Sequence, residues 1–415
     1  MRASWARKDM TSSASRFDNK QSDMTHDTAH DITTDLIHHP YTAPDGWQAP
    51  QAGVFKASTV MFKDTAAMRS RDWRHKSGYT YGLHGTPTTF TLEARIATLE
   101  GGSHCVLSPS GLAAIANVDF ALLAQGDELL LPANVYGPSR ELARHELARL
   151  GVTHRHYDPM DAAALAAMIG PRTKLIWLEA PGSVTMEFPD LRGLIAAAKA
   201  KGVITAIDNT WGAGLAFNGF ALGADIVMQA LTKYPSGGGD VLMGSVTTRD
   251  FALHERIKLT HMRLGLGVGA NDAEFVLRGL SSIALRYHAG DAAGRELAAW
   301  LATRPEVAKV LHPALPGSPG HEHWKNHCSA AAGLFSIMLD ARYSASQVDA
   351  FVDALRLFKI GYSWAGPVSL VVPYDLAVMR DAAPYAGSLV RFSMGLEAVA
   401  DLRADIEQAL VALAG

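Results

Sequence analysis

A carboxylate and an amine lie one strand-helix-strand step apart in the middle of the chain. Asp208 and Lys233 each follow an apolar run of strand length. Such a pair could hold the two poles of pyridoxal 5'-phosphate (PLP), because a lysine condenses with its aldehyde and a carboxylate keeps its pyridine nitrogen protonated. The spacing is equally compatible with an ordinary salt bridge at a sheet edge, since structural ion pairs also occur at such positions.

Two glycine-containing turns could lie beside a phosphate group. Residues 108–112 (SPSGL) lead into a helix expected over residues 113–123. The start of a helix offers unpaired backbone N–H groups to an anion, although many helices begin this way and bind nothing. Residues 236–239 (SGGG) lack the Gly-Lys-Ser/Thr that completes a P-loop, so we expect a mobile turn beside Lys233.

The motifs of several other chemistries are missing from the sequence. There is no GxGxxG after a first strand, no HExxH and no GxSxG, which argues against dinucleotide, zinc-protease and serine-hydrolase functions. Two His-x-His pairs have no third ligand at a familiar spacing, so we predict no metal site. These pairs are His154 with His156 and His321 with His323.

The elements around these residues alternate as in a parallel sheet covered by helices, which predicts an α/β fold. One unit runs from a strand at residues 175–178 through a helix to a strand at residues 203–207. Asp190 can cap the start of this helix and Gly202 can end it. A further strand is expected at residues 226–230. Ligands of such sheets bind beyond the carboxyl ends of the strands, where the carboxylate and the amine described above both fall.

The length of 415 residues predicts two principal folded units. The first forty residues are rich in Ser, Thr, Asp and His without hydrophobic period, which favours a flexible leader. Beyond residue 285, strands at 334–339 and 389–393 between amphipathic helices indicate a smaller α+β domain. The predicted organisation is a leader (1–40), an arm that needs another surface to pack on (41–85), a PLP-binding α/β domain (86–284) and a C-terminal α+β domain (285–415).

Composition excludes several partners. With 38 basic and 41 acidic residues the net charge is −3, and no long basic run suits a nucleic-acid backbone. No stretch of about 18 apolar residues predicts a membrane span, and the N-terminus lacks the apolar region of a signal peptide. The two cysteines, Cys105 and Cys328, are too few for a disulfide framework, which favours a reducing cytoplasm.

In their order along the chain, these segments resemble the Cys/Met-metabolism family of PLP-dependent enzymes. The resemblance covers roughly residue 79 to the end and implies the type I, aspartate-aminotransferase-like fold. By matching the family's motifs, it implies catalytic roles for Lys233 and Tyr136. It implies a cofactor site of Lys233, Asp208, Tyr136, Gly111, Leu112, Thr232 and Tyr81, and a substrate site of Arg391, Ser363 and Trp364.

Within that family the stretch 179–187 (EAPGSVTME) is similar to one found in the bacterial cystathionine β-lyases. Residues 311–317 resemble the same group, although their proline and glycine content favours a structural turn. The resemblance therefore implies β-elimination of L-cystathionine to homocysteine, pyruvate and ammonia. The alternatives are a cysteine desulfhydrase, a γ-lyase or a γ-synthase of the same family, and a PLP-fold protein that binds without catalysis.

The sequence departs from the family pattern at two places. The family usually has Tyr-x-Arg where this chain has Tyr81-Gly82-Leu83, so that Leu83 replaces an arginine which reaches the cofactor phosphate of a neighbouring subunit. We expect Tyr81 to keep its role and His84 or a backbone donor to replace the cation. Residues 365–369 (AGPVS) differ from the usual Gly-Gly-x-Glu-Ser. Because Tyr81 would serve a neighbour, the resemblance implies at least a dimer and, as is common in the family, a homotetramer built as a dimer of dimers.

Overall fold

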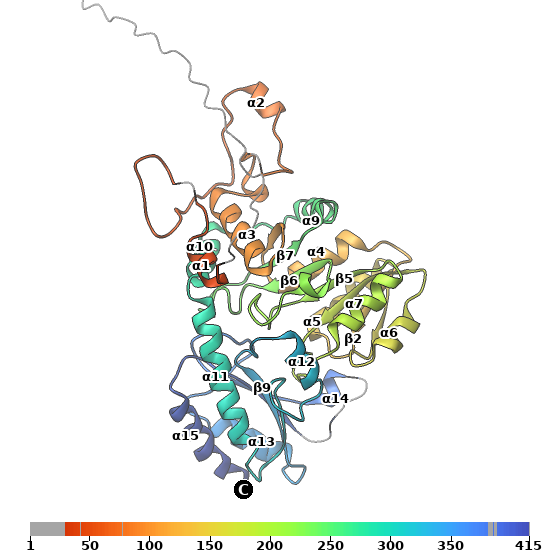
Figure 1. Cartoon of the computed structure of the whole chain (residues 1–415), viewed down its shortest axis with the longest axis vertical. Coiled ribbons are helices and arrows are strands. Elements are labelled where there is room, and N and C mark those ends of the chain that lie inside the picture. The colour runs from red at the N-terminus through yellow and green to blue at the C-terminus, as the bar shows by residue number, and fades with distance from the viewer. Residues whose placement is uncertain (1–29, 42, 77, 381–384, 386–387, 415) are drawn as a thin grey trace, which may run out of the picture. The chain divides into compact units, whose positions relative to one another are not determined.

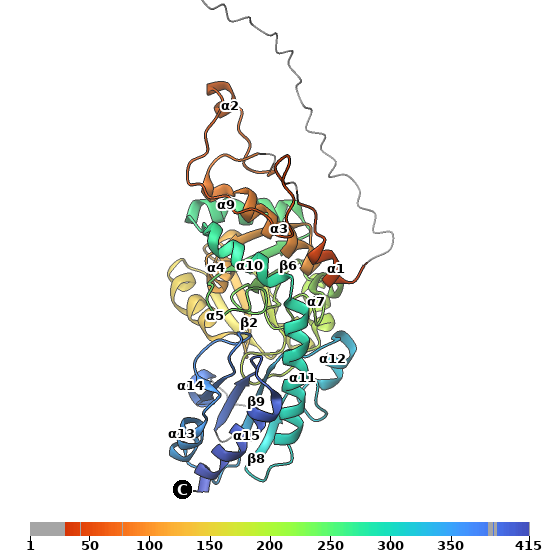
Figure 2. The ribbon, with the colours of Figure 1, turned by 90° about the vertical axis from the view of Figure 1, so that its left-hand side faces the viewer.

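The computed structural model describes residues 30–41, 43–76, 78–380, 385 and 388–414. The chain divides into two units, and all elements described below belong to the second, which begins at Ile32. Figures 1 and 2 show its two sheets and their helices. Among the described residues, no helix is both long and apolar enough to cross a membrane.

The larger sheet has seven strands in the order β1-β7-β6-β5-β4-β2-β3. Their bounds are β1 (His104–Ser108), β2 (Glu128–Pro132), β3 (Thr153–Tyr157), β4 (Thr173–Glu179), β5 (Ile204–Asp208), β6 (Ile226–Ala230) and β7 (Gly244–Thr248). Only β7 runs antiparallel to its neighbours, β1 and β6, whereas the pairs among the other strands are parallel. The predicted mostly parallel sheet is therefore confirmed.

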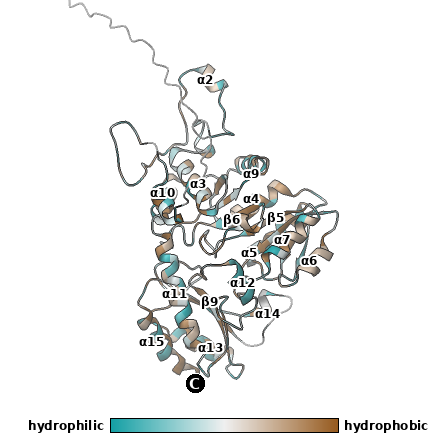
Figure 3. Ribbon diagram, in the orientation of Figure 1, coloured by the Kyte–Doolittle hydropathy of each residue, from teal (hydrophilic) through white to brown (hydrophobic). Residues whose placement is uncertain are grey.

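Both faces of this sheet are buried, as a parallel sheet requires. Along β4 the side chains alternate: Leu175 and Trp177 enter one hydrophobic core, and Ile176 and Leu178 enter another. The covering helices are α3 (Pro87–Glu100), α4 (Gly111–Leu122), α5 (Gly137–Leu142), a π-helical turn (Ala143–Leu147), α6 (Ala162–Met168), α7 (Leu191–Ala200), α8 (Gly219–Leu222), α9 (Phe251–Leu264) and α10 (Ala270–Leu280). In Figure 3 hydrophobic colouring gathers on the strands around β5.

The predicted strand-helix-strand unit is the segment β4-α7-β5. The side chain of Asp190 caps α7 by accepting a hydrogen bond from the backbone N–H of Gly193, at 3.1 Å. Gly202 follows the helix with a φ of 66°, in the left-handed region that glycine adopts without strain. Helix α4 begins two residues earlier than expected, because Ser110 is its N-cap.

The C-terminal part contains a second sheet in the order β10-β11-β12-β9-β8. Its elements are α11 (Ile283–Leu301), β8 (Val307–Leu311), α12 (His321–His327), β9 (Leu334–Leu339), α13 (Ala345–Ala354), β10 (Lys359–Ile360), β11 (Leu370–Tyr374), α14 (Leu376–Met379), β12 (Leu389–Ser393), α15 (Val399–Leu410) and a 3-10 turn (Val411–Ala414). Helix α11 joins the two parts, because Tyr287 lies in the core of the larger sheet and Leu297 in that of the smaller one. The expected boundary at 284/285 falls inside this helix.

The N-terminal segments contain more structure than the sequence indicated. Residues 1–29 of the expected flexible leader lie outside the described residues, but Ile32–Ile37 forms helix α1, which packs against α3. The leader prediction is wrong for this helix, because Leu36 is buried in the main core and anchors it. The arm contains α2 (Thr65–Arg69) and a 3-10 turn (Gly82–His84).

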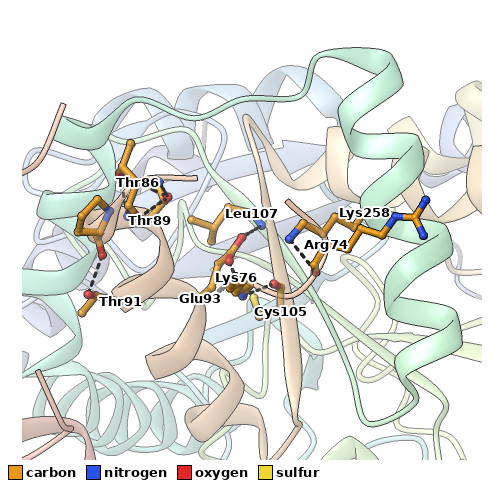
Figure 4. A network of polar contacts seen from close by, with 10 residues as sticks. Arg74, Lys76, Thr86, Thr89, Thr91, Glu93, Cys105, Leu107 and Lys258 are labelled. Atoms are coloured by element: carbon orange, nitrogen blue, oxygen red, sulfur yellow. Dashed lines mark hydrogen bonds and ion pairs between the residues drawn. The ribbon is translucent and has the colours of Figure 1, made fainter. Parts of the chain in front are cut away.

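A polar network ties the arm to the body of the protein (Figure 4). Lys76 forms an ion pair of 2.5 Å with Glu93 of α3 and donates to the carbonyl of Cys105 in β1. Glu93 accepts the backbone N–H of Leu107, and Lys258 of α9 donates to a carbonyl of the arm. Because Lys76 contacts α3 and β1 and Lys258 comes from α9, this part of the arm is held by three elements.

Glu100, at the end of α3, is a fully buried carboxyl group without a cationic partner among the described residues. Its oxygens accept hydrogen bonds from the side-chain amides of Asn209 and Gln229. Burial and, to a smaller extent, the neighbouring Asp208 raise the pKa of Glu100 to about 7, against the opposing effect of the two hydrogen bonds. The folded protein therefore keeps this proton at pH values where the unfolded chain has already lost it.

We expect Glu100→Gln to make the protein more stable than wild type above neutral pH. Between about pH 4.5 and 7 the folded state binds the extra proton, so the wild-type free energy of unfolding falls as pH rises, by on the order of 3 kcal/mol. The variant lacks this slope, and it should be no more stable than wild type near pH 4. Urea titrations across this range measure the difference, with the exposed Glu296→Gln as control. A constant offset at all pH values would contradict the prediction.

Candidate active site

A cavity of about 540 Å³ lies at the carboxyl ends of β4, β5 and β6 and is closed by residues of the smaller sheet. Its volume suits a small ligand. The structure brings nine of the ten residues expected in the site into its wall: Gly111, Leu112, Tyr136, Asp208, Thr232, Lys233, Ser363, Trp364 and Arg391. Tyr81 does not line this cavity.

Lys233 follows β6, and its amine is held by residues from the C-terminal part. The Nζ atom donates to Oγ of Ser363 at 2.6 Å and lies 5.3 Å from the ring centroid of Trp364. Burial and, to a smaller extent, the charge of Arg391 lower the pKa of Lys233 to about 8. A lysine of this kind carries a substantial neutral fraction near pH 8 and can act as a nucleophile or a base.

Two carboxyl groups lie side by side at the ends of β4 and β5, where Glu179 pairs with Asp208 in the parallel register. Asp208 accepts the backbone N–H of Thr210 at 2.9 Å. Burial raises the pKa of Glu179 well above its usual value, and the charge of Asp208 raises it further. Burial also raises the pKa of Asp208, but its bonds to Thr210 and the charge of Lys233 oppose this. We infer that Glu179 holds the proton and Asp208 is the anion of the pair.

Tyr136 stands at the cavity mouth, with 42% of its surface exposed. Its backbone N–H donates to Oε2 of Glu179 at 2.7 Å, so the neighbouring strand end fixes the start of α5. The pKa of the Tyr136 phenol is raised by burial and by Asp208 and Glu179. A flat aromatic ring beside Asp208 and Lys233 suits stacking on a planar ligand.

The opposite end of the cavity is built for an anion. Gly111 and Leu112 are the first two residues of α4, so their backbone N–H groups have no acceptor within the helix. A Cβ atom on Gly111 would lie 2.8 Å from Cβ of Ala230, so only glycine lets the helix start approach β6 this closely. The hydroxyl of Thr232 accepts the backbone N–H of Met243 at 3.1 Å. A phosphate fits this end, an amine-reactive carbonyl fits Lys233, and a protonated ring nitrogen fits Asp208, which together match PLP.

Arg391 is a buried cation without a counter-ion among the described residues. It is 8% exposed, and burial lowers its pKa. One of its N–H groups donates to the carbonyl of Ser363 at 3.2 Å. Burying a guanidinium without an anion is costly, so the site is suited to a carboxylate that arrives with a ligand.

The cavity wall contains strained backbone. Ser363 and Ala365 have φ angles of 96° and 65°, and Val184 and Met186 have φ angles of 71° and 59°. Such angles are unfavourable for residues with a Cβ atom, above all for the β-branched valine, and they persist only where surrounding contacts impose them. Ser336 supplies one such contact by donating to the carbonyl of Val184 at 2.6 Å.

A buried ion pair fixes the same stretch of the wall from the other side. Arg380, just after α14, donates to Oε1 of Glu187 at 3.1 Å and to the hydroxyl of Thr185. Oε2 of Glu187 also accepts Asn134 at 3.1 Å. Burial alone would raise the pKa of Glu187, yet the bonds and charge of Arg380 hold that pKa below its usual value.

We expect Arg380→Met to lower the free energy of unfolding by about 3–5 kcal/mol, because it leaves the buried carboxylate of Glu187 without its cationic partner. Urea denaturation measures this change. The matched control is Arg149→Met, which removes an exposed ion pair with Glu146 and should cost less than about 1 kcal/mol. Equal effects of the two substitutions would refute the role of the buried pair.

Leu83, at the position of the missing family arginine, and the neighbouring His84 do not line the cavity that contains Lys233. Leu83 lies in the 3-10 turn of the arm. His84 stacks on Trp73 with ring centroids 5.2 Å apart, and its Nδ1 is bonded to the hydroxyl of Thr80. Burial lowers the pKa of His84, as do the charges of Lys258 and Arg71. A lowered pKa favours the neutral imidazole of His84 in this conformation.

Sequence reasoning missed several residues of the wall. Glu179 is the first residue of the motif at 179–187, and the parallel pairing of β4 with β5 is the signal that predicts its position opposite Asp208. Tyr374, Tyr362 and Leu242 also line the cavity, but none belongs to a recognisable motif. Tyr374 reaches the site only through the antiparallel pairing of β11 with β12.

Known proteins match the chain over nearly its whole length. A family model described as Cys/Met metabolism PLP-dependent enzyme matches residues 33–411. A cystathionine beta-lyase of Bordetella avium is 39% identical, covering 90% of this chain and 96% of its own length. A cystathionine beta-lyase of Salmonella typhimurium is 37% identical, covering 85% and 91%. The crystal structure of metB from Corynebacterium glutamicum is similar with a TM-score of 0.85 at 28% identity, covering 92% of this chain and 98% of that one. The fold class predicted from the sequence is thereby confirmed.

Proposed function

Because the chain belongs to the Cys/Met metabolism family of PLP-dependent enzymes, we propose that it cleaves L-cystathionine by β-elimination to homocysteine, pyruvate and ammonia. The observation that carries the proposal is the single cavity that holds Lys233, Asp208 and Arg391. The cystathionine beta-lyases named above support the substrate, since they match most of the chain. A small amino acid with a thioether at its β carbon fits the cavity.

Each end of the cofactor has residues suited to it. When bound, PLP supplies an electron sink for charge that develops at the substrate Cα. Asp208, as the anion of its carboxyl pair, would keep the ring nitrogen protonated. The free N–H groups at the start of α4 would bind the phosphate, together with Thr232. Tyr136 would stack on the ring.

The substrate would be held and deprotonated by side chains from both sheets. Arg391 would bind the α-carboxylate through two parallel hydrogen bonds, which its planar guanidinium favours. The amine of Lys233, with its lowered pKa, would take the proton from Cα. The hydroxyl of Ser363 accepts a hydrogen bond from this amine and would orient it. Trp364 lines the same side of the cavity. Tyr136 would assist proton transfer.

Tyr81 is the residue of the arm through which we connect the proposed function to an oligomer. Its side chain is 47% exposed and outside the cavity of its own chain. We propose that it reaches the cofactor phosphate of a neighbouring subunit, with a backbone donor in place of the arginine that Leu83 replaces. At least a dimer would follow, and we propose a homotetramer. A reducing, cytoplasmic location is proposed from the two free cysteines, Cys105 and Cys328.

Product analysis tests the function directly. Purified protein with added PLP is incubated with cystathionine, cysteine and methionine in parallel. We expect pyruvate, with the highest kcat/KM for cystathionine. Release of 2-oxobutanoate would instead indicate a γ-lyase, and pyruvate mainly from cysteine would indicate a desulfhydrase. No product from any of the three would overturn the proposal.

A further inference from the structure

Tyr374 is placed beside Arg391 by the register of the smaller sheet. In the antiparallel pair of β11 and β12, Arg391 lies opposite Val372, and Tyr374 lies two residues further along. Alternate residues of a strand share a face, so Tyr374 is the diagonal neighbour of Arg391 on the cavity side. The guanidinium carbon lies 5.3 Å from the centroid of the tyrosine ring.

The phenol of Tyr374 and the guanidinium of Arg391 lie close enough to affect each other's pKa. A guanidinium can only donate, so the phenol oxygen of Tyr374 can serve it only as an acceptor. The hydroxyl hydrogen therefore remains free to donate elsewhere. One N–H group of Arg391 donates to the carbonyl of Ser363. The ring contact and this bond hold the guanidinium from two sides and leave its other N–H groups for a ligand.

The surroundings offer the phenol no acidic partner. Its pKa is raised first by burial, and the charged or polar groups that act on it are Arg391 and Tyr362. Tyr136 lies close enough for its own pKa to be affected by Tyr374. No hydrogen bond from the Tyr374 hydroxyl to an acceptor is found within the described part of the chain. Tyr374 lines the open cavity next to Arg391, a cation for which the described residues provide no counter-ion. A hydroxyl donor in that place suits a carboxylate oxygen.

We propose that Tyr374 is a substrate-binding residue, which locks the orientation of Arg391 and donates a second hydrogen bond to the α-carboxylate of the amino acid. This rests on the proposed function, in which Arg391 binds that carboxylate. The guanidinium takes the carboxylate as a fork, and the phenol binds a remaining lone pair of one oxygen. The carboxylate would then be held from two β-strands of one sheet, which limits its rotation.

The test distinguishes binding of the α-carboxylate from binding of the rest of the ligand. L-Alanine carries the α-carboxylate and no leaving group, and ethylamine is the same molecule without the carboxylate. Both are assayed as competitive inhibitors of pyruvate release from cystathionine. Both are also assayed by the rise in Tm of the PLP-loaded protein, which needs no turnover. The variants are Tyr374→Phe, which keeps the ring contact, and Tyr374→Leu, which removes it.

We expect Tyr374→Phe to raise the inhibition constant of L-alanine about tenfold, as loss of one hydrogen bond to a charged group would. The constant for ethylamine should stay within about twofold. Tyr374→Leu should weaken L-alanine further, because Arg391 also loses its support. The matched control is Tyr343→Leu, which removes the contact of Arg342 with a tyrosine ring at 5.0 Å, outside the cavity. It should change neither constant.

Two results would overturn the inference: equal L-alanine affinity in Tyr374→Phe and wild type, or equal weakening of L-alanine and ethylamine. The variant Arg391→Met distinguishes failure of the inference about Tyr374 from failure of the proposed function. If Arg391→Met abolishes the preference for L-alanine over ethylamine while Tyr374→Phe does not change this preference, only the proposed role of Tyr374 is wrong. If Arg391→Met leaves the preference intact, the carboxylate site itself is wrong.

Discussion

Lys233→Ala is expected to lower pyruvate release from cystathionine by at least about 10³-fold. A positioned general base alone contributes about 10²–10⁴-fold, and this lysine would also be the point where the cofactor is attached. The absorption band of lysine-bound PLP should disappear from the purified variant. Its side chain contacts Ser363 and Trp364, so the loss removes one hydrogen bond and one ring contact without affecting the strands.

The matched control for this prediction is Lys201→Ala, at the exposed end of α7. It removes the same number of atoms and the same charge far from the cavity, so both activity and absorption band should be those of wild type. Steady-state kinetics and a spectrum of each protein are sufficient. A Lys233→Ala variant that keeps the band and the activity would show that another lysine carries the cofactor.

Arg391→Met is expected to lower kcat/KM for cystathionine by roughly 30- to 4,000-fold. Truncating one partner of a buried charge pair costs about 2–5 kcal/mol, and each 1.4 kcal/mol is tenfold. Arg391→Lys should restore little of this, because a lysine cannot present two parallel N–H groups to a carboxylate. The loss should fall mainly on KM at the level of substrate binding.

The same substitution should not destabilise the protein. In the absence of substrate, Arg391 is a buried cation that no described carboxylate compensates. Replacing it by an apolar side chain of similar length removes a desolvation cost, so the free energy of unfolding should stay equal or rise. Urea denaturation without substrate measures this, with the exposed Arg342→Met as control. A large loss of stability would mean that Arg391 serves the fold rather than a ligand.

These two variants probe opposite sides of the cavity. Lys233 comes from the larger sheet and Arg391 from the smaller one, and Ser363 contacts both of them. The strained backbone at Ser363 allows its hydroxyl to face Lys233 while its carbonyl faces Arg391. The geometry of the site therefore depends on how α11 and the cavity wall join the two sheets.

The sequence determined the part of the site that lies on parallel strands. Asp208 and Lys233 follow apolar runs that form β5 and β6, and parallel strands place their carboxyl ends at one edge of the sheet. The cap at Asp190 and the hydrophobic period of α7 are local signals, so this unit could be read directly. Family motifs then indicated which residues from distant segments share the cavity. The composition of the first forty residues, in contrast, did not reveal helix α1.

Only the tertiary structure decided how charges and hydrogen bonds are distributed around those residues. The raised pKa of Glu179 follows from its burial beside Asp208, and the lowered pKa of Lys233 follows from burial and from Arg391. Tyr374 enters the site through a strand register that no local pattern encodes. Desolvation and through-space charge depend on which distant segments pack together, whereas caps and strand periods depend on neighbours in the chain. For this reason the sequence could identify the chemical groups, and the fold had to set their protonation and partners.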